Sequence, residues 1–129
     1  MIGRTAGGAL LATGVAALAL IPVASGSPSQ VTSAKAPVKR TVKVRDYYFS
    51  PESLKVPRKS TIRFKWPSAG NEGDTHDVKL KKGPEGVKHW HSELAASDYT
   101  FRRKLWKKGK YKFICTLHPY DMHTTIRVR

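Results

Sequence analysis

Eight consecutive residues near the C-terminus, 115–122, concentrate the side chains best suited to bind a soft metal ion. They include Cys115, the only cysteine of the chain, together with His118 and Met122. A thiolate, an imidazole and a thioether are ligands that suit copper rather than hard cations. A second imidazole would complete a His2Cys set with a weak axial methionine, the arrangement of blue copper sites. The segment therefore predicts a mononuclear metal site that still lacks one strong ligand.

The second imidazole is predicted to come from His76. Residues 76–80 alternate between inward and outward positions, so His76 begins an inward-facing row. Considered alone, this strand is equally compatible with an ordinary core or rim histidine. Residues 111–115 form another alternating strand, and Cys115 is its last inward residue. If these strands are antiparallel neighbours, His76 and Cys115 meet at the same end of the fold.

The three remaining histidines, at positions 89, 91 and 123, are not needed for the predicted copper site. His89 and His91 are two residues apart, a spacing that would put both rings on one face of a strand as a second, weak metal site. Surface histidines beside a tryptophan need no such function. His123 should point away from Met122 by strand alternation, and we interpret it as solvated.

The segments that must position these ligands are short and extended. Seven of them show strand-like alternation: 41–45, 54–56, 61–66, 76–80, 99–105, 111–115 and 125–129. No segment supports a long amphipathic helix. The pattern predicts an all-β fold, an antiparallel Greek-key β-sandwich of about seven strands. Residues 48–51 are expected to form a turn, residues 81–97 an irregular loop or one helical turn, and Arg103 interrupts the inward row of its strand.

The N-terminal part is predicted to be an export signal and a linker. Residues 1–26 combine an early arginine, an apolar stretch rich in Ala and Leu, and small residues suited to cleavage. An uncleaved N-terminal anchor is the alternative. Residues 27–40 are rich in Ser, Pro, Ala and Lys and are expected to be a flexible linker before the domain at 41–129. The protein is therefore expected outside the cytoplasm, in the periplasm, the cell envelope or the medium.

The composition narrows the set of partners. The net charge is +15, and residues 1–26 contain one basic and no acidic residue, so the remainder keeps +14. Export makes nucleic acid a poor partner, which leaves acidic redox proteins, an anionic membrane surface or a cell-wall polymer. A single cysteine excludes an internal disulfide and a two-thiolate binuclear centre. We expect a monomer.

At these residues the sequence resembles the cupredoxins, the blue copper group that includes plastocyanin, amicyanin and azurin. The resemblance covers most of 41–129 and is most specific at 111–119. It implies one type 1 copper, with His76, Cys115 and His118 as strong ligands and Met122 as the weak axial ligand. It also implies that the histidine at 118 reaches the surface and passes electrons, with Leu117, Pro119 and Tyr120 beside it as a contact patch.

Three positions depart from the family's pattern. Three residues separate His118 from Met122, as in azurin, whereas the amicyanin-like branch has two and plastocyanin has four. Asp77 stands where plastocyanin-like proteins usually have Asn, a residue that braces the two ligand loops. Thr124 stands where many relatives have Gly.

Three functions fit the sequence. The first is a one-electron carrier between redox proteins, which uses a copper ion that changes oxidation state with little ligand movement. The second is copper storage, delivery or sequestration with the same ligands. The third is a metal-free basic β-sandwich that binds the envelope. An enzyme such as a multicopper oxidase is not expected, because it needs further copper ligands.

Overall fold

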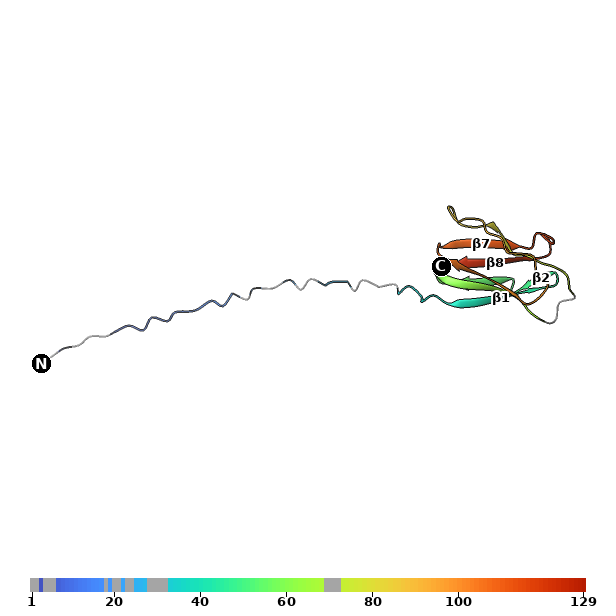
Figure 1. The fold of residues 1–129 in the computed structure, drawn as a ribbon. Coiled ribbons are helices and arrows are strands. Elements are labelled where there is room, and N and C mark those ends of the chain that lie inside the picture. Colours follow the sequence, from blue (N-terminus) through green and yellow to red (C-terminus); the bar gives the residue numbers. More distant parts are fainter. Residues whose placement is uncertain are drawn as a thin grey trace. The chain divides into compact units, whose positions relative to one another are not determined.

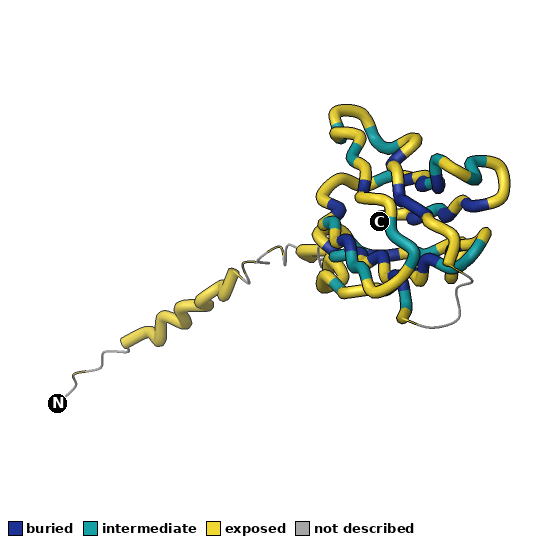
Figure 2. The backbone as a smooth tube through the Cα atoms, turned by 45° about the vertical axis from the view of Figure 1, so that its right-hand side comes forward, coloured by how far each residue is buried: buried dark blue, intermediate teal, exposed yellow. Residues whose placement is uncertain are grey.

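The structure, a computed structural model, describes residues 3, 7–17, 19, 22, 25–27, 33–68 and 73–129. The chain divides into two units, Met1–Val31 and Thr32–Arg129. In the first unit, residues 7–17 are exposed throughout (Figure 2). Parts of the predicted leader and of the predicted linker lie outside the described residues, so export and the domain boundaries stay predictions. Among the described residues, no helix has both the length and the apolar character needed to cross a membrane.

The second unit is a sandwich of two four-stranded sheets. Its strands are β1 (Lys39–Arg45), β2 (Tyr48–Ser50), β3 (Ser53–Val56), β4 (Ser60–Trp66), β5 (Lys79–Lys82), β6 (Tyr99–Leu105), β7 (Gly109–Ile114) and β8 (His123–Val128). One sheet has the order β2-β1-β4-β6 and the other β3-β8-β7-β5. Figure 1 shows β1 and β2 in one layer and β7 and β8 in the other. The predicted all-β sandwich is confirmed.

Two details of the predicted sandwich are wrong. Residues 48–50 form β2, an eighth strand antiparallel to β1, instead of a turn. Phe49 explains the difference, because its side chain is buried in the core and the reversal lies earlier, at Tyr47, whose φ is 68°. The sheets are also mixed, since β1 pairs with β4 and β3 with β8 in parallel. Between the two strands of each parallel pair, the chain crosses to the other sheet and back. This crossing allows the two strands to run in the same direction.

The core lies between the sheets and is largely aromatic. Phe64 of β4 packs edge-on against Phe113 of β7, with ring centroids 5.1 Å apart, and joins the two layers. The inward row of β6 continues through Arg103, because its guanidinium lies 4.1 Å from the centroid of the Phe101 ring and 5.3 Å from that of Trp90. These cation–π contacts let a charged residue occupy a half-buried position.

The predicted antiparallel neighbours are confirmed as β5 and β7. Their register pairs Lys79 with Ile114, which brings the residue after β7, Cys115, near the chain that leads into β5. β5 begins at Lys79, three residues later than expected, and His76 forms an isolated bridge with Ala95. The intervening segment 83–98 is irregular and contains no helix. His76 is therefore held by this segment rather than by a regular sheet.

Candidate metal centre

Three side chains converge at the end of the sandwich where β7 ends. The Nδ1 atoms of His76 and His118 lie 3.9 and 3.8 Å from the Sγ atom of Cys115. One ligand atom from each residue lies within 4.8 Å of the other two. His76 and Cys115 are fully buried, whereas His118 is partly exposed. Within the described part of the chain, this is the one group of three or more His, Cys, Asp or Glu residues close enough to share a metal ion.

His76 is fixed on both its backbone and its ring. Its N–H and C=O groups exchange hydrogen bonds of 3.0 Å with Ala95, and the indole N–H of Trp66 donates to its carbonyl oxygen at 3.1 Å. On the ring, Nε2 lies 2.8 Å from Oδ1 of Asp46. Because a carboxylate accepts, this contact assigns the proton to Nε2 and leaves the Nδ1 lone pair toward Cys115.

The loop 115–122 closes on itself through its backbone. The N–H of Cys115 donates to the carbonyl oxygen of Met122 at 3.1 Å, and the N–H of Met122 donates to the carbonyl oxygen of His118 at 2.9 Å. The side chain of Met122 is fully buried, beside the core. The three intervening residues thus form a single hydrogen-bonded turn that returns Met122 to Cys115.

Asp77 ties the two ligand segments together. Its carboxylate accepts from the backbone N–H of Thr116 at 2.6 Å, and the Thr116 hydroxyl makes a second, short hydrogen bond to it. His91 contributes its Nε2 at 2.5 Å. Burial raises the pKa of Asp77, but the hydrogen bonds from Thr116 and His91 outweigh that effect, and the pKa lies below 3.8. The aspartate is therefore ionised and performs the bracing role expected of Asn.

The thiol of Cys115 lies in an environment that disfavours its charge. Burial raises its pKa above the ordinary value of 9.0, despite hydrogen bonds from the backbones of Asp77, Leu117 and His118. A metal ion binds the thiolate, so metal binding at neutral pH must displace a proton from this sulfur. The three backbone hydrogen bonds then stabilise the thiolate that remains.

Tyr47 covers the two imidazoles. Its ring meets those of His118 and His76 edge-on, with centroids 5.1 and 5.9 Å apart. Its hydroxyl makes a short hydrogen bond to Asp74. A tyrosine with φ of 68° is uncommon, and the ring contacts hold it in place. The cover restricts water on that side of the cluster.

The distances fit one metal ion. Metal–sulfur and metal–nitrogen bonds of about 2.3 and about 2.0 Å span the observed 3.8–3.9 Å at an angle of about 125–130°. Such an angle would suit one ion held by one sulfur and two nitrogens, and Met122, in the same loop as Cys115 and His118, is fully buried. With Met122, the cluster has the composition and arrangement of a type 1 copper site.

The structure brings together the predicted residues His76, Cys115 and His118, and Met122 lies fully buried at the end of the loop that carries Cys115 and His118. Of the two histidines considered for a second, weak site, His91 contacts Asp77 through its Nε2 and His89 is exposed. His123 is exposed, as expected. The sequence did not point to Asp46 or Tyr47. The only local signal was an Asp-Tyr-Tyr turn sequence, which does not reveal that the turn lies over His76.

Comparisons with known proteins place these features in context. A family model described as the cupredoxin-like domain matches residues 14–128. A copper-containing nitrite reductase from Thermus scotoductus is 28% identical with a TM-score of 0.56, and the match covers 73% of this chain but 22% of the reductase. No curated protein sequence matches the chain.

Two smaller proteins share the fold over most of their length. An amicyanin variant in its reduced state is 19% identical with a TM-score of 0.59, over 69% of this chain and 80% of the amicyanin. A pseudoazurin from Sinorhizobium is 22% identical with a TM-score of 0.59, over 71% of this chain and 74% of the pseudoazurin. At these identities the likeness establishes the fold.

Proposed function

The chain belongs to the cupredoxin family, and from this premise we propose that it is an exported blue copper protein that carries single electrons between redox proteins. In this proposal His76, Cys115 and His118 are the strong ligands and Met122 is the weak axial ligand. The nitrite reductase that matches this chain is described as copper-containing, which supports the choice of metal. Because the match covers 22% of the reductase, its activity is not carried over.

The observation that carries the proposal is the preformed cluster of one thiol and two imidazole nitrogens. Copper held by these ligands would supply a one-electron redox couple, because thiolate and imidazole ligands together stabilise both copper(I) and copper(II). The chain's own contribution is rigidity. Asp46 fixes one imidazole, Asp77 fixes the strand end that carries the thiol, and the closed loop fixes Met122. Ligands held in this way move little when the metal charge changes.

The surface beside His118 is suited to brief contact with another protein. Leu117 and Tyr120 have 51% and 91% of their surface exposed, and Tyr47, whose ring meets that of His118, is 49% exposed. We propose these residues, with Pro119, as the patch through which electrons enter and leave by way of His118. A small apolar patch of this kind permits fast dissociation, which a diffusing carrier requires.

Charge is distributed unevenly over the domain. The acidic residues Asp46, Asp74, Asp77 and Asp121 all belong to the end that holds the cluster. The outward faces of the strands are instead rich in Lys and Arg. We propose that these basic faces attract acidic redox partners or an anionic membrane or wall surface, and that the monomeric carrier exchanges electrons at its less basic end.

The proposed role is that of a carrier rather than an enzyme. The described residues contain one cluster that could hold a metal, and the chain has a single cysteine. The leader predicted at 1–26 supports a location outside the cytoplasm, where copper proteins of this kind meet diffusing partners.

The electron self-exchange rate of the copper-loaded protein tests the proposal. We expect fast exchange between copper(I) and copper(II) molecules, measured by NMR line broadening in mixtures of the two. Because the molecules carry a large like charge, added salt should accelerate this exchange. Salt should slow reduction by an acidic redox protein. Slow self-exchange with rapid transfer of copper to a chelator would instead support storage or delivery.

Asp46 provides a second prediction. Replacing Asp46 with Ala should lower copper affinity about 10–100-fold, because the Nε2 proton of His76 loses its acceptor and the ring loses its orientation. Competition titration with a copper(I) chelator measures the change. Glu52→Ala, which removes an exposed carboxylate that has no contact with the cluster, is the matched control. Equal affinities for the two variants would show that Asp46 does not orient the ligand.

A further inference from the structure

A second concave site lies on the flank of the sandwich, away from the cluster. It is a cavity of about 350 Å³ between the irregular segment after β5 and the turn that joins β6 to β7. β7 begins at this turn and reaches the metal cluster only at its opposite end. The proposed electron-carrier function does not use this cavity.

The walls of the cavity are built by specific contacts. The ammonium group of Lys107 donates to the carbonyl oxygen of Glu85 at 2.7 Å, and the hydroxyl of Tyr111 donates to the carbonyl oxygen of Lys107 at 2.8 Å. Gly86 permits the first contact, because a Cβ atom there would lie 2.8 Å from the Lys107 nitrogen. Gly109 likewise allows Pro84 to approach the turn closely. The cavity walls are therefore held by side chains that hydrogen-bond to backbone carbonyl groups and pack closely at two glycines.

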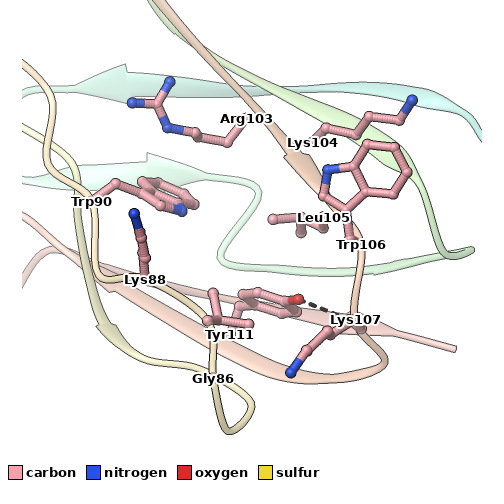
Figure 3. A pocket seen from close by; sticks show the side chains of 10 residues that line it. Gly86, Lys88, Trp90, Arg103, Lys104, Leu105, Trp106, Lys107 and Tyr111 are labelled. Carbon is pink, nitrogen blue, oxygen red and sulfur yellow. Dashed lines mark hydrogen bonds between the residues drawn. The ribbon is translucent and has the colours of Figure 1, made fainter.

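Aromatic rings form much of the lining. Trp90 is anchored in the core, with its ring centroid 5.0 Å from that of Phe113 and its carbonyl oxygen bonded to the N–H of Leu80 at 3.0 Å. Trp106 is 56% exposed, an unusual position for the largest apolar side chain. Figure 3 shows the two indoles on opposite sides of Leu105. A flat ring placed over Leu105 would bury apolar surface between the two indoles.

Four cations surround these rings (Figure 3): Lys88, Arg103, Lys104 and Lys107. Among the residues that the structure describes, no carboxylate lies within 4.0 Å of any of them. Arg103 is held over Trp90, and the ammonium group of Lys104 lies 4.4 Å from the centroid of the Trp106 ring. The cavity therefore combines flat apolar surface with positive charge that forms no ion pair with any carboxylate in the described part of the chain.

We propose that this cavity binds an aromatic acid, a molecule of one or two fused rings that carries a carboxylate, sulfonate or phosphate group. Pockets for small ligands occupy about 300–1,000 Å³, and a volume of about 350 Å³ admits a ligand at the small end of that range. The ring lies against the indoles, and the acidic group accepts hydrogen bonds from Arg103 and the lysines. Binding leaves the copper ligands untouched.

Titration of the full-length chain, without added metal, with naphthalenesulfonate tests this proposal. The indole N–H signals of Trp90 and Trp106 should shift saturably in NMR spectra, while that of Trp66, buried in the core, should not. Naphthalenemethanol, which lacks the charge, and inorganic sulfate, which lacks the ring, should each bind at least about tenfold more weakly. Equal binding of the neutral alcohol, or of sulfate alone, would overturn the proposal.

Two double variants distinguish binding of naphthalenesulfonate in this cavity from nonspecific attraction of the anion to the positively charged protein. Lys88→Ala with Lys104→Ala should weaken naphthalenesulfonate binding about tenfold. Lys43→Ala with Lys65→Ala removes the same charge from exposed positions on β1 and β4 and should change binding less than about twofold. All four lysines are exposed, so the fold is retained, and the Trp66 signal reports it. Equal weakening by both pairs would contradict a specific site.

Discussion

Replacing Cys115 with serine is expected to abolish the intense visible absorption of the copper(II)-loaded protein completely. That absorption arises from charge transfer between the thiolate sulfur and copper, and a hydroxyl oxygen does not replace the sulfur. Cys115 is the only cysteine, so no other residue in the chain provides a thiolate. The affinity for copper(I) should fall by several orders of magnitude for the same reason. Absorption spectra of the variant and the parent at equal copper loading measure the first effect.

Met122→Leu is the matched control for this experiment. It conserves side-chain volume at a fully buried position and removes only the weak axial sulfur. This variant should keep an intense band, with a raised reduction potential, because the three strong ligands remain. A Cys115→Ser protein that retains the band would contradict the assignment of Cys115 as a ligand. A colourless parent protein after copper addition would contradict the blue copper function itself.

The cluster could be predicted from the sequence because its parts obey local rules. Only two residues separate Cys115 from His118, and alternation places His76 and Cys115 at inward positions of neighbouring strands. The antiparallel pairing of β5 with β7 then brings these positions together. Such inference depends on side-chain period and strand direction, both of which can be derived from the sequence.

The residues around the cluster could not be predicted in this way. Asp46 and His76 are 30 positions apart in the sequence. Their contact depends on the turn before β2, whereas the sequence pattern predicts the turn at residues 48–51. The burial of Phe49 determines where that turn lies, because its ring reaches the core only if residues 48–50 form β2. The local sequence pattern does not show that Phe49 will be buried. The sequence likewise assigns no role to Trp90 and predicts only that Arg103 interrupts the inward row, whereas the two side chains stack on each other. Long-range packing determines each of these positions.

Asp77 is expected to show the largest stability effect of the residues around the cluster. Its carboxylate accepts hydrogen bonds from the backbone and hydroxyl of Thr116 and from His91, and its side chain is 1% exposed. Asp77→Ala leaves the backbone N–H and the hydroxyl of the half-buried Thr116 without their acceptor and should lower the free energy of unfolding by about 2–4 kcal/mol. Asp77→Asn keeps an acceptor for Thr116 and should cost about 1–2 kcal/mol. Chemical denaturation of the metal-free proteins measures both values.

The pH dependence of the Asp77→Asn variant follows from the lowered pKa of Asp77. The folded state lowers the pKa of the Asp77 carboxyl group below its ordinary value of 3.8. The ionised group therefore stabilises the fold at pH values above that ordinary pKa. That contribution disappears as the pH falls through the lower, folded-state pKa. The stability difference between the parent and Asp77→Asn should therefore be constant above about pH 5 and shrink below pH 3.8. A difference that grows as the pH falls would mean that Asp77 is protonated in the folded protein, and the brace between His76 and Cys115 would then need a different explanation.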